Sequence, residues 1–477
     1  MPLLTNRWRP LLPVALLLLI PGISAAEEEP IVKNVLYVIA DDLKASVLGC
    51  YGHPLCETPN IDRLAEHGTR FTRAYCQAPV CAPSRPSIMF GRYGRRNIDH
   101  AKHKSFPQVL KENGWYSARV SKIYHMRVPG DIVEGTNGGD HAASWTERFN
   151  SPGKEESTPG LYQCLNINDI KRDLDDRQGA RTKNRAYVAV IDESDGSDQP
   201  DAKTAAKAIE LLREHKDEPF VLAVGFVRPH YPHVAPEPYF GRYPIEKIRM
   251  PKRLADDWDD IPRSGISSSN SQANGLARYP DNQKRMWSAY EASVSFMDDQ
   301  LGKVLAELDR LGLRDSTAVI FTSDHGYHLG EHDFWQKANL HEEATRVPLI
   351  VSIPGLRPGV SDAPVELVDL YPTVMQLVGL DVPKQCHGKS LLPILENHDA
   401  TTRDYAFSYD GRRKMPTQFA IRGKRWAYMQ YPDGEELYDM QRDPEQFTNL
   451  AGDASHASVL DQCRSKLAEK KKIMLGQ

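Results

Sequence analysis

Five apolar runs stand out along the chain, and each predicts a strand of a buried β-sheet. They cover residues 35–40, 115–120, 220–227, 317–322 and 347–353. The run at 35–40 is continuous rather than alternating and is partly β-branched, as expected of a strand that is buried on both faces. A sheet built from such strands needs a layer of helices on each side.

Four segments between these runs have the periodicity and the end signals of helices. They cover residues 58–68, 106–113, 201–215 and 283–311. The first has Pro59 at its first position and Gly68 as its stop, and the third places Ala205, Ala208 and Leu212 on one face. Because strands alternate with helices, the sequence predicts an α/β fold with a large, mostly parallel mixed sheet flanked by helices.

The pattern changes after about residue 400. Short strands at 405–409, 418–422 and 426–430 and a helix at 459–474 predict a small antiparallel sheet with one helix. We therefore expect a main domain over residues 31–395 and a small C-terminal subdomain over residues 396–477. The polar segments 126–185 and 262–281 are predicted to be loops, the second one long enough to serve as a lid.

The first 26 residues have the features of a secretory signal peptide. Arg7 and Arg9 precede an apolar run at 11–20, and small residues at 24–26 offer a cleavage site. The run is too short for a comfortable membrane span, so we expect no membrane anchor after cleavage. The protein is predicted to be secreted or periplasmic, with a bacterial envelope favoured.

Composition narrows the classes of function. Hydrophobic residues make up 40% of the chain and charged residues 26%, as in ordinary soluble globular proteins. The formal net charge is −4, which argues against a nucleic-acid partner because such proteins are normally basic. Seven cysteines in 477 residues are too sparse for a disulfide scaffold, although export permits disulfides whose pairing the sequence leaves open.

Polar side chains follow the predicted strands at the point where each one ends. They are Asp41 and Asp42, Lys122, His230, and Asp324 with His325. In open α/β sheets this edge is where ligands bind. Neighbouring carboxylates repel one another without a cation, and hard divalent cations such as Ca²⁺ prefer carboxylate oxygens. Taken singly, each residue also fits a solvated turn, and His325 could be a metal ligand or a hydrogen-bonding neighbour.

The stretch around Cys81 predicts an anion site at the start of a helix. Cys81 and Arg85 precede an apolar run, and the first turn of a helix offers unpaired backbone N–H groups to anions. Lys122 and Lys337 could join Arg85 in neutralising a dianion. His125 and His230 could move protons, since histidine titrates near neutrality. The plain alternative is a buried cysteine beside surface cations and loop histidines.

Together these motifs resemble the sulfatase family. The resemblance rests on Cys81-Ala82-Pro83-Ser84-Arg85, with further matches at 34–42, 58–62, 229–232, 323–326, 437–439, 443–444 and 449–450. It covers nearly the whole chain after the signal peptide. Within the family, the stretches 48–52, 121–125 and 329–337 are most similar to those of iduronate-2-sulfatases and their bacterial relatives. Ser121 departs from the pattern, since a glycine is common there.

The resemblance implies a fold, two cofactors and partners. The fold would be of the alkaline phosphatase and sulfatase type. A maturation enzyme would oxidise Cys81 to formylglycine, and one Ca²⁺ would be held by Asp41, Asp42, residue 81, Asp324 and His325. The substrate would be a sulfated saccharide, such as a fragment of a glycosaminoglycan or an algal polysaccharide.

The resemblance also implies roles for the remaining site residues. One hydroxyl of the hydrated formylglycine would attack the sulfur of a sulfate ester, while Arg85, Lys122 and Lys337 stabilise the sulfate oxygens. His230 would protonate the departing sugar oxygen. His125 would then help to withdraw a proton from the second hydroxyl, so that sulfate leaves and the aldehyde is restored.

Three other functions fit parts of the pattern. A phosphonate or phosphodiester hydrolase of the same superfamily would use a similar site. A non-catalytic binder of sulfated glycans would keep the fold, but would need neither a convertible Cys81 nor both His125 and His230. A two-zinc alkaline phosphatase would need a Ser or Thr nucleophile and more histidine ligands than the sequence offers.

Overall fold

The computed structural model describes residues 2, 30–94, 98–172, 185–411 and 416–476. Apart from residue 2, the predicted signal peptide over residues 1–26 lies outside the described residues.

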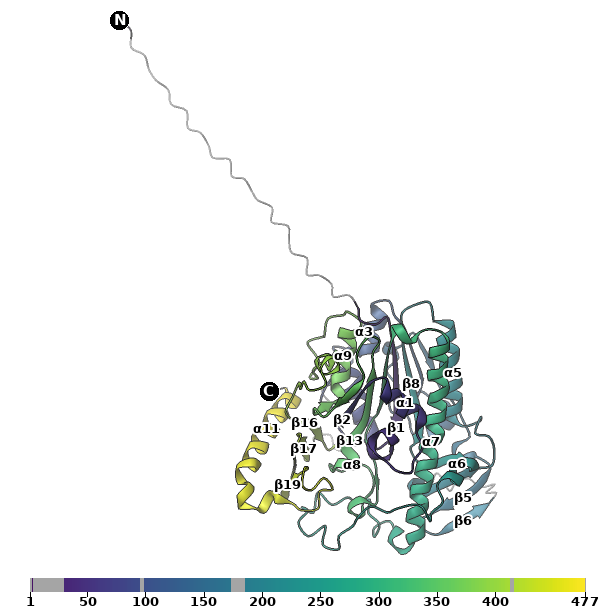
Figure 1. Cartoon of the computed structure of the whole chain (residues 1–477), viewed down its shortest axis with the longest axis vertical. Helices are drawn as coiled ribbons and strands as arrows, with labels where there is room; N and C mark the ends of the chain where they lie inside the picture. Colours follow the sequence, from purple (N-terminus) through teal and green to yellow (C-terminus); the bar gives the residue numbers. More distant parts are fainter. Residues whose placement is uncertain (1, 3–29, 95–97, 173–184, 412–415, 477) are drawn as a thin grey trace.

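A nine-stranded mixed sheet forms the centre of the molecule (Figure 1). Its strands are β1 Asn34–Asp41, β2 Thr69–Tyr75, β3 Tyr116–Ser121, β4 Glu147–Phe149, β8 Phe220–Pro229, β10 Thr317–Ser323, β13 Arg346–Ser352, β14 Gly359–Ser361 and β15 Val365–Glu366. The order is β14-β2-β13-β10-β1-β8-β3-β4, with β15 also paired to β2. Every pairing is parallel except those of β13, so the predicted mostly parallel sheet is confirmed.

Helices cover both faces of this sheet. In β1, Leu36, Val38 and Ala40 pack into one hydrophobic core, and Val35, Tyr37 and Ile39 pack into another. The first core is closed by α1 Pro59–Glu66, α5 Pro200–Glu214 and α7 Pro280–Arg310. The second is closed by α2 Cys81–Phe90, α3 Phe106–Glu112 and α9 Leu370–Leu377. Burial on both faces explains the continuous apolar runs.

The predicted helices form close to their expected bounds. A proline occupies the first turn of α1, α3, α5 and α7, where its missing N–H costs no hydrogen bond. Five helices were not expected, namely α4 Gly130–Glu134, α6 Glu237–Arg242, α8 Glu342–Thr345, α9 and α10 Leu392–Glu396.

The prediction that residues 126–185 are only loops is wrong. This segment contains β4, β5 Gly160–Cys164 and β6 Asp169–Arg172. The last two join β7 Val188–Asp192 and β9 His233–Pro236 in a second sheet of order β6-β5-β7-β9. These strands are short and partly polar, so their partners, rather than their own sequence pattern, define them.

A four-stranded antiparallel sheet follows the main sheet along the chain. Its strands are β16 Ala406–Tyr409, β17 Phe419–Arg422, β18 Trp426–Tyr431 and β19 Gly434–Asp439, and α11 Ala457–Leu475 packs on it. The predicted sheet and helix are confirmed. β19 was missed because Gly434, Glu435 and Glu436 are poor strand formers. The boundary at residue 395 stays a prediction.

A two-stranded hairpin, β11 His328–Leu329 with β12 Trp335–Gln336, lies beyond the end of β10. The long polar segment before α7 is irregular, as predicted, apart from one turn at 276–278. Among the described residues, no helix is long and apolar enough to cross a bilayer.

Candidate active site

The register of the central sheet brings the predicted residues to one edge. Ala40 of β1 lies beside Ser323 of β10, so the next residues, Asp41 and Asp324, are neighbours. Asp41 also lies beside Pro229 of β8, which places His230 at the same height. Ser121 of β3 lies beside Gly225 of β8, and Lys122 follows it.

Two of these strand ends have unusual backbone conformations. Asp42 has φ 64° and Ser121 has φ 61°, both in the left-handed region that favours glycine. A glycine would therefore suit position 121 because of its backbone conformation, and Ser121 adopts this conformation at some cost in strain. Gly225 is required for another reason, because a Cβ there would lie 2.3 Å from the carbonyl oxygen of Lys122.

Cys81 is the first residue of α2, as predicted, and its side chain is 3% exposed. Its Sγ lies 3.2 Å from His325 Nε2, 3.2 Å from Lys337 Nζ and 3.8 Å from Asp42 Oδ1. Burial raises the pKa of the Cys81 thiol well above its ordinary value. An unmodified cysteine would therefore stay protonated, and a thiol is a weak nucleophile.

Five side chains at this edge can hold a metal ion. One ligand atom from each of Asp41, Asp42, Cys81, Asp324 and His325 lies within 4.8 Å of all the others, and all five residues are buried. Asp42 Oδ2 is buried and has no hydrogen-bond partner among the described residues. His325 Nδ1 lies 2.9 Å from the Gly326 carbonyl, so Nδ1 donates and the Nε2 lone pair faces the cluster. This donor set fits a hard divalent cation.

Three cations surround the carboxylates. Arg85 donates from Nε to Asp324 Oδ2 at 2.8 Å and from Nη2 to Asp41 Oδ1 at 3.0 Å. Lys122 pairs with Asp41, and Lys337 pairs with Asp42. Arg85 and Lys122 are fully buried, and the Lys337 side chain is 12% exposed.

Burial and charge move the pKa values of these groups in opposite directions. Burial raises the pKa of Asp41, but Lys122, His230 and Arg85 outweigh it and hold that pKa well below its usual value. The pKa of Asp42 is raised, chiefly by burial. Burial opposes the charge of Lys337, but the Asp42 carboxylate raises the Lys337 pKa well above its usual value. Each charge of the Asp42–Lys337 pair thus favours the ionised form of the other residue.

Both predicted histidines lie at the same edge. His230 Nδ1 is 2.6 Å from the Tyr231 carbonyl and therefore donates to it, while Nε2 lies 3.9 Å from Asp42 Oδ2. Burial lowers the pKa of His230 well below its ordinary value and that of His125 to about 4. His125 Nδ1 is buried without a hydrogen-bond partner among the described residues. Both imidazoles are neutral at pH 7 in this state.

Sequence reasoning missed residues that hold the catalytic edge in place. Ser84 Oγ donates to the Asp324 carbonyl at 2.6 Å, and Tyr290 Oη donates to the Asp42 carbonyl at 2.6 Å. Tyr290 lies within the helix predicted over residues 283–311, where its hydroxyl gives no separate signal. Tyr231 places its ring 5.7 Å from Lys337 Nζ, a cation–π contact.

The loop that carries Lys337 is held by a distant segment. This Lys337 loop, residues 328–340, contains four non-glycine residues with positive φ, namely His332, Asp333, Gln336 and Ala338. We call residues 253–271, which pack along it, the strap. Three hydrogen bonds join the strap to the loop. Arg253 Nε donates to the Gly330 carbonyl at 2.9 Å, and Trp258 Nε1 donates to the His332 carbonyl at 2.8 Å. The Ser271 backbone N–H donates to the Asp333 carbonyl at 3.0 Å.

Fold and site together define a class of protein. A doubly covered α/β sheet presents, at the ends of its strands, a carboxylate-rich cluster that can hold a metal ion and is ringed by buried cations. This edge is where α/β proteins bind ligands, and the cations suit an anionic one. A family model described as Sulfatase matches residues 33–380, and one described as N-sulphoglucosamine sulphohydrolase, C-terminal, matches residues 330–473. The chain belongs to the sulfatase family.

Individual proteins agree with this assignment. Iduronate 2-sulfatase of Homo sapiens is 34% identical over 404 residues, which cover 74% of this chain and 70% of that protein. Among solved structures, a complex with its substrate D-glucosamine-2-N,6-O-disulfate has a TM-score of 0.70 at 21% identity, covering 94% of this chain and 99% of that one. The phosphonate monoester hydrolase of Agrobacterium radiobacter has a TM-score of 0.74 at 24% identity, covering 92% and 95%. These structures show the fold alone.

Proposed function

We propose that this protein is a sulfuric ester hydrolase that removes sulfate from a sulfated sugar, with residue 81 as the nucleophile after oxidation. The observation that carries the proposal is the buried cluster of Cys81 with three aspartates and His325, faced by Arg85, Lys122 and Lys337. Family membership supports the reaction class.

The cluster would supply the ligands for one Ca²⁺, and a maturation enzyme would convert Cys81 to formylglycine. Asp41, Asp42, Asp324, His325 and residue 81 would hold the ion. Bound there, the ion would supply Lewis-acid polarisation of sulfate oxygens, and the hydrated aldehyde of residue 81 would supply a nucleophilic hydroxyl. A plain thiol would be a poor substitute, since burial keeps Cys81 protonated.

The charges of the site favour an anionic ester. Three carboxylates face three permanent cations, so the buried groups are nearly balanced by themselves. A bound divalent cation would leave an excess of positive charge in a region from which water is excluded. A sulfate ester, which carries negative charge on its non-bridging oxygens, compensates that excess.

Arg85, Lys122 and Lys337 orient the sulfate oxygens and stabilise the charge that develops on them. His230 donates a proton from Nε2 to the departing sugar oxygen. Its neutral imidazole acquires this proton when the anionic ester enters, because a neighbouring negative charge raises a histidine pKa. His125 accepts a proton at its free Nδ1 in the step that releases sulfate.

The substrate we propose is a sulfated saccharide of the iduronate 2-sulfate type, from a glycosaminoglycan or a similar algal polysaccharide. Two relatives support the class: iduronate 2-sulfatase at 34% identity, and the structural neighbour that binds a disulfated glucosamine. The predicted signal peptide supports action outside the cytoplasm, where such polysaccharides are found.

Substrate comparison tests the proposal. Enzyme co-expressed with a formylglycine-generating enzyme is assayed on 4-nitrophenyl sulfate, 4-nitrophenyl phosphate and a phenylphosphonate monoester, and on disaccharides sulfated at iduronate O2 or glucosamine O6. We expect the largest kcat/KM on a sulfated disaccharide and at least a tenfold preference for sulfate over phosphorus esters. A preference for the phosphonate would support the rival hydrolase, and binding without turnover would support a glycan-binding protein.

A further inference from the structure

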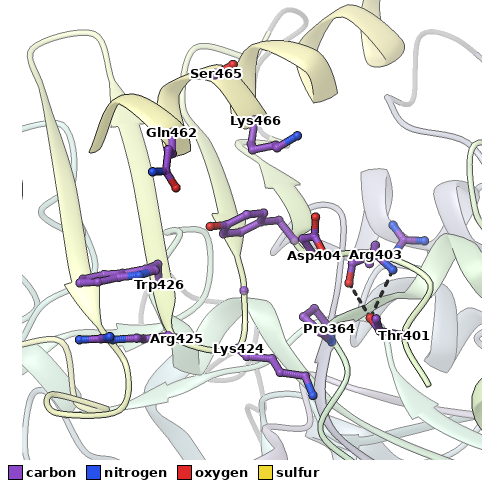
Figure 2. A pocket seen from close by; sticks show the side chains of 12 residues that line it. Pro364, Thr401, Arg403, Asp404, Lys424, Arg425, Trp426, Gln462, Ser465 and Lys466 are labelled. Carbon is purple, nitrogen blue, oxygen red and sulfur yellow. Dashed lines mark hydrogen bonds between the residues drawn. The ribbon is translucent and has the colours of Figure 1, made fainter. Parts of the chain in front are cut away.

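A pocket lies in the C-terminal part of the chain (Figure 2). It has a volume of about 630 Å³ and opens between the β17–β18 turn, the segment before β16, and α11. A neighbouring pocket of about 400 Å³ adjoins it and shares lining residues with it, among them Arg403 and Lys466. Two adjoining pockets offer a chain-like ligand contacts along more than one of its units.

The pocket is separate from the active site. It begins where β16 begins, whereas the other end of β16 reaches the catalytic helix α2 through Tyr409 Oη, 3.3 Å from Ser87 Oγ. At about 3.3 Å per residue, roughly 13 Å of extended chain from Tyr405 to Tyr409 lies between the pocket and the contact with α2. None of the catalytic candidates lines the pocket.

One wall of the pocket is a fixed aromatic surface. The Arg425 guanidinium lies 4.7 Å from the Trp426 ring centre and is itself held by Asp439 at 2.7 Å. Figure 2 shows the indole lying flat against Arg425, with Gln462 on its other side. A rigid aromatic face beside an amide and the Ser465 hydroxyl combines the apolar and hydrogen-bonding groups that a sugar ring presents.

Two exposed lysines flank this aromatic wall. Lys424 is 48% exposed and pairs with Asp362, which is 53% exposed, and Lys466 is 46% exposed and lies 3.4 Å from Glu469, which is 61% exposed. Surface ion pairs of this kind contribute about 0–1 kcal/mol, so either lysine can turn to a ligand anion at little cost. A sulfate group offers a lysine charge-assisted hydrogen bonds. Of the two arginines that line the pocket, Arg425 is paired with Asp439, and Arg403 is buried against Glu366 and Asp369.

We propose that this pocket is an accessory binding site for a sulfated oligosaccharide chain. Sugar rings would pack on Trp426 while Lys424 and Lys466 hold sulfate groups. The choice of ligand class rests on the proposed function, whereas the site itself rests on the pocket's own side chains. Such a site would retain a polymeric substrate while the catalytic edge acts on another part of it, which raises the effective concentration of substrate.

Binding to the full-length Cys81→Ala variant tests this proposal without turnover. The probe is a sulfated octasaccharide from heparin or from carrageenan, with the chemically desulfated octasaccharide alongside, and Kd is measured by calorimetry. We expect Lys424→Ala/Lys466→Ala and Trp426→Ala each to raise the Kd for a sulfated probe about tenfold. Lys472→Ala, an exposed lysine of the same helix outside the pocket, should leave it unchanged.

The binding measurements can also overturn the proposed accessory site. Failure of both sulfated probes to bind, or a Kd that changes less than twofold in both pocket variants, overturns the accessory site. The Lys424→Ala/Lys466→Ala variant changes only exposed side chains, and its Tm shows whether it is folded. The test therefore remains valid even if Trp426→Ala does not fold. Turnover of 4-nitrophenyl sulfate by the chain with Cys81 intact reports on the proposed function separately, because that small ester does not need the pocket.

Discussion

Three buried aspartates at the sheet edge dominate the site at the scale of single residues. Their mutual repulsion is relieved by cations, and Asp42 Oδ2 is left without a hydrogen bond among the described residues. Since a ligand that binds only the folded state stabilises it by about 2.7 kcal/mol at 100 times its Kd, saturating Ca²⁺ should raise the Tm. We predict that Asp42→Asn abolishes this rise, as measured by calorimetry with and without Ca²⁺.

Asp461→Asn is the matched control, because Asp461 is an exposed aspartate on α11. It should keep the full Ca²⁺-dependent rise in Tm. An Asp42→Asn protein that Ca²⁺ stabilises as much as the wild type would remove Asp42 from the ligand set.

Glu291 of α7 makes stability depend on pH. It is 1% exposed, and burial raises its pKa from 4.5 to about 8. Between these values the folded state binds a proton that the unfolded state has lost, so its contribution to stability is present below pH 4.5 and is lost as the pH rises to 8. Because glutamine stays neutral, we predict that Glu291→Gln is more stable than the wild type by about 2–4 kcal/mol at pH 8.5.

Urea unfolding at pH 5 and pH 8.5 measures this effect. The advantage of Glu291→Gln should be small at pH 5 and grow toward pH 8.5. Glu214→Gln, on the exposed side of α5, should show no such trend. A gap between Glu291→Gln and the wild type that stays constant across this range contradicts the assignment.

The placement of Asp41 and Asp324 at one sheet edge could be predicted from the sequence because each comes at the end of an apolar strand. Cys81 and Lys337 follow no such strand and were singled out by their motifs instead. The exact arrangement of these side chains could not be predicted. Asp42 and Ser121 reach their positions through left-handed backbone conformations, and Tyr290 reaches the Asp42 carbonyl from a helix more than 240 residues further along the chain. Such contacts depend on tertiary packing, which leaves no local signal.

At the scale of elements, the strap decides where Lys337 lies. The polar composition of residues 262–281 predicted a loop, but nothing in that composition indicated that the strap, residues 253–271, holds the Lys337 loop. The Trp258 indole donates to the His332 carbonyl at 2.8 Å, and His332 Nδ1 lies 3.0 Å from Asp257 Oδ2. These contacts fix a stretch of backbone with several positive φ values, which would otherwise relax.

Trp258→Phe tests this role because it removes the indole N–H and keeps an aromatic ring. Displacement of a positioned group by about 1 Å can cost up to a hundredfold in rate, so we predict a three- to tenfold loss in kcat/KM on 4-nitrophenyl sulfate. Trp115→Phe is the control, since its indole donates to the Lys33 carbonyl at 2.9 Å, away from the site. Equal losses in the two variants would show that the strap has no special part in catalysis.

At the scale of the whole molecule, buried charges connect the C-terminal part to the central sheet. Arg403 is 4% exposed and pairs with Glu366 and Asp369, which are both fully buried. Removing one partner of a buried charge group leaves the others uncompensated and typically costs 3–5 kcal/mol. We predict that Arg403→Gln lowers the free energy of unfolding by about 3 kcal/mol.

Denaturant unfolding measures this loss. Arg464→Gln breaks the exposed pair with Glu435 and should cost less than about 1 kcal/mol, as exposed pairs do. If Arg403→Gln proves no more costly than Arg464→Gln, the buried group contributes little to joining the two parts.

The central sheet could be predicted from the sequence more completely than the second, smaller sheet. Apolar runs identify β1, β8, β10 and β13 because both faces of the sheet are covered. The second sheet was missed because β5 and β6 are short and only partly apolar, and their register is set by each other and by β7. Strands that depend on pairing rather than on burial are the ones that a single sequence does not reveal.

The chemical state of residue 81 in active protein tests the central claim most directly. Mass spectrometry of the proteolytic peptide that contains Cys81 distinguishes a thiol from an aldehyde. We predict that the aldehyde fraction rises in proportion to the specific activity for sulfate release across preparations with different degrees of maturation. A fully active preparation in which Cys81 is an unmodified thiol would contradict the account.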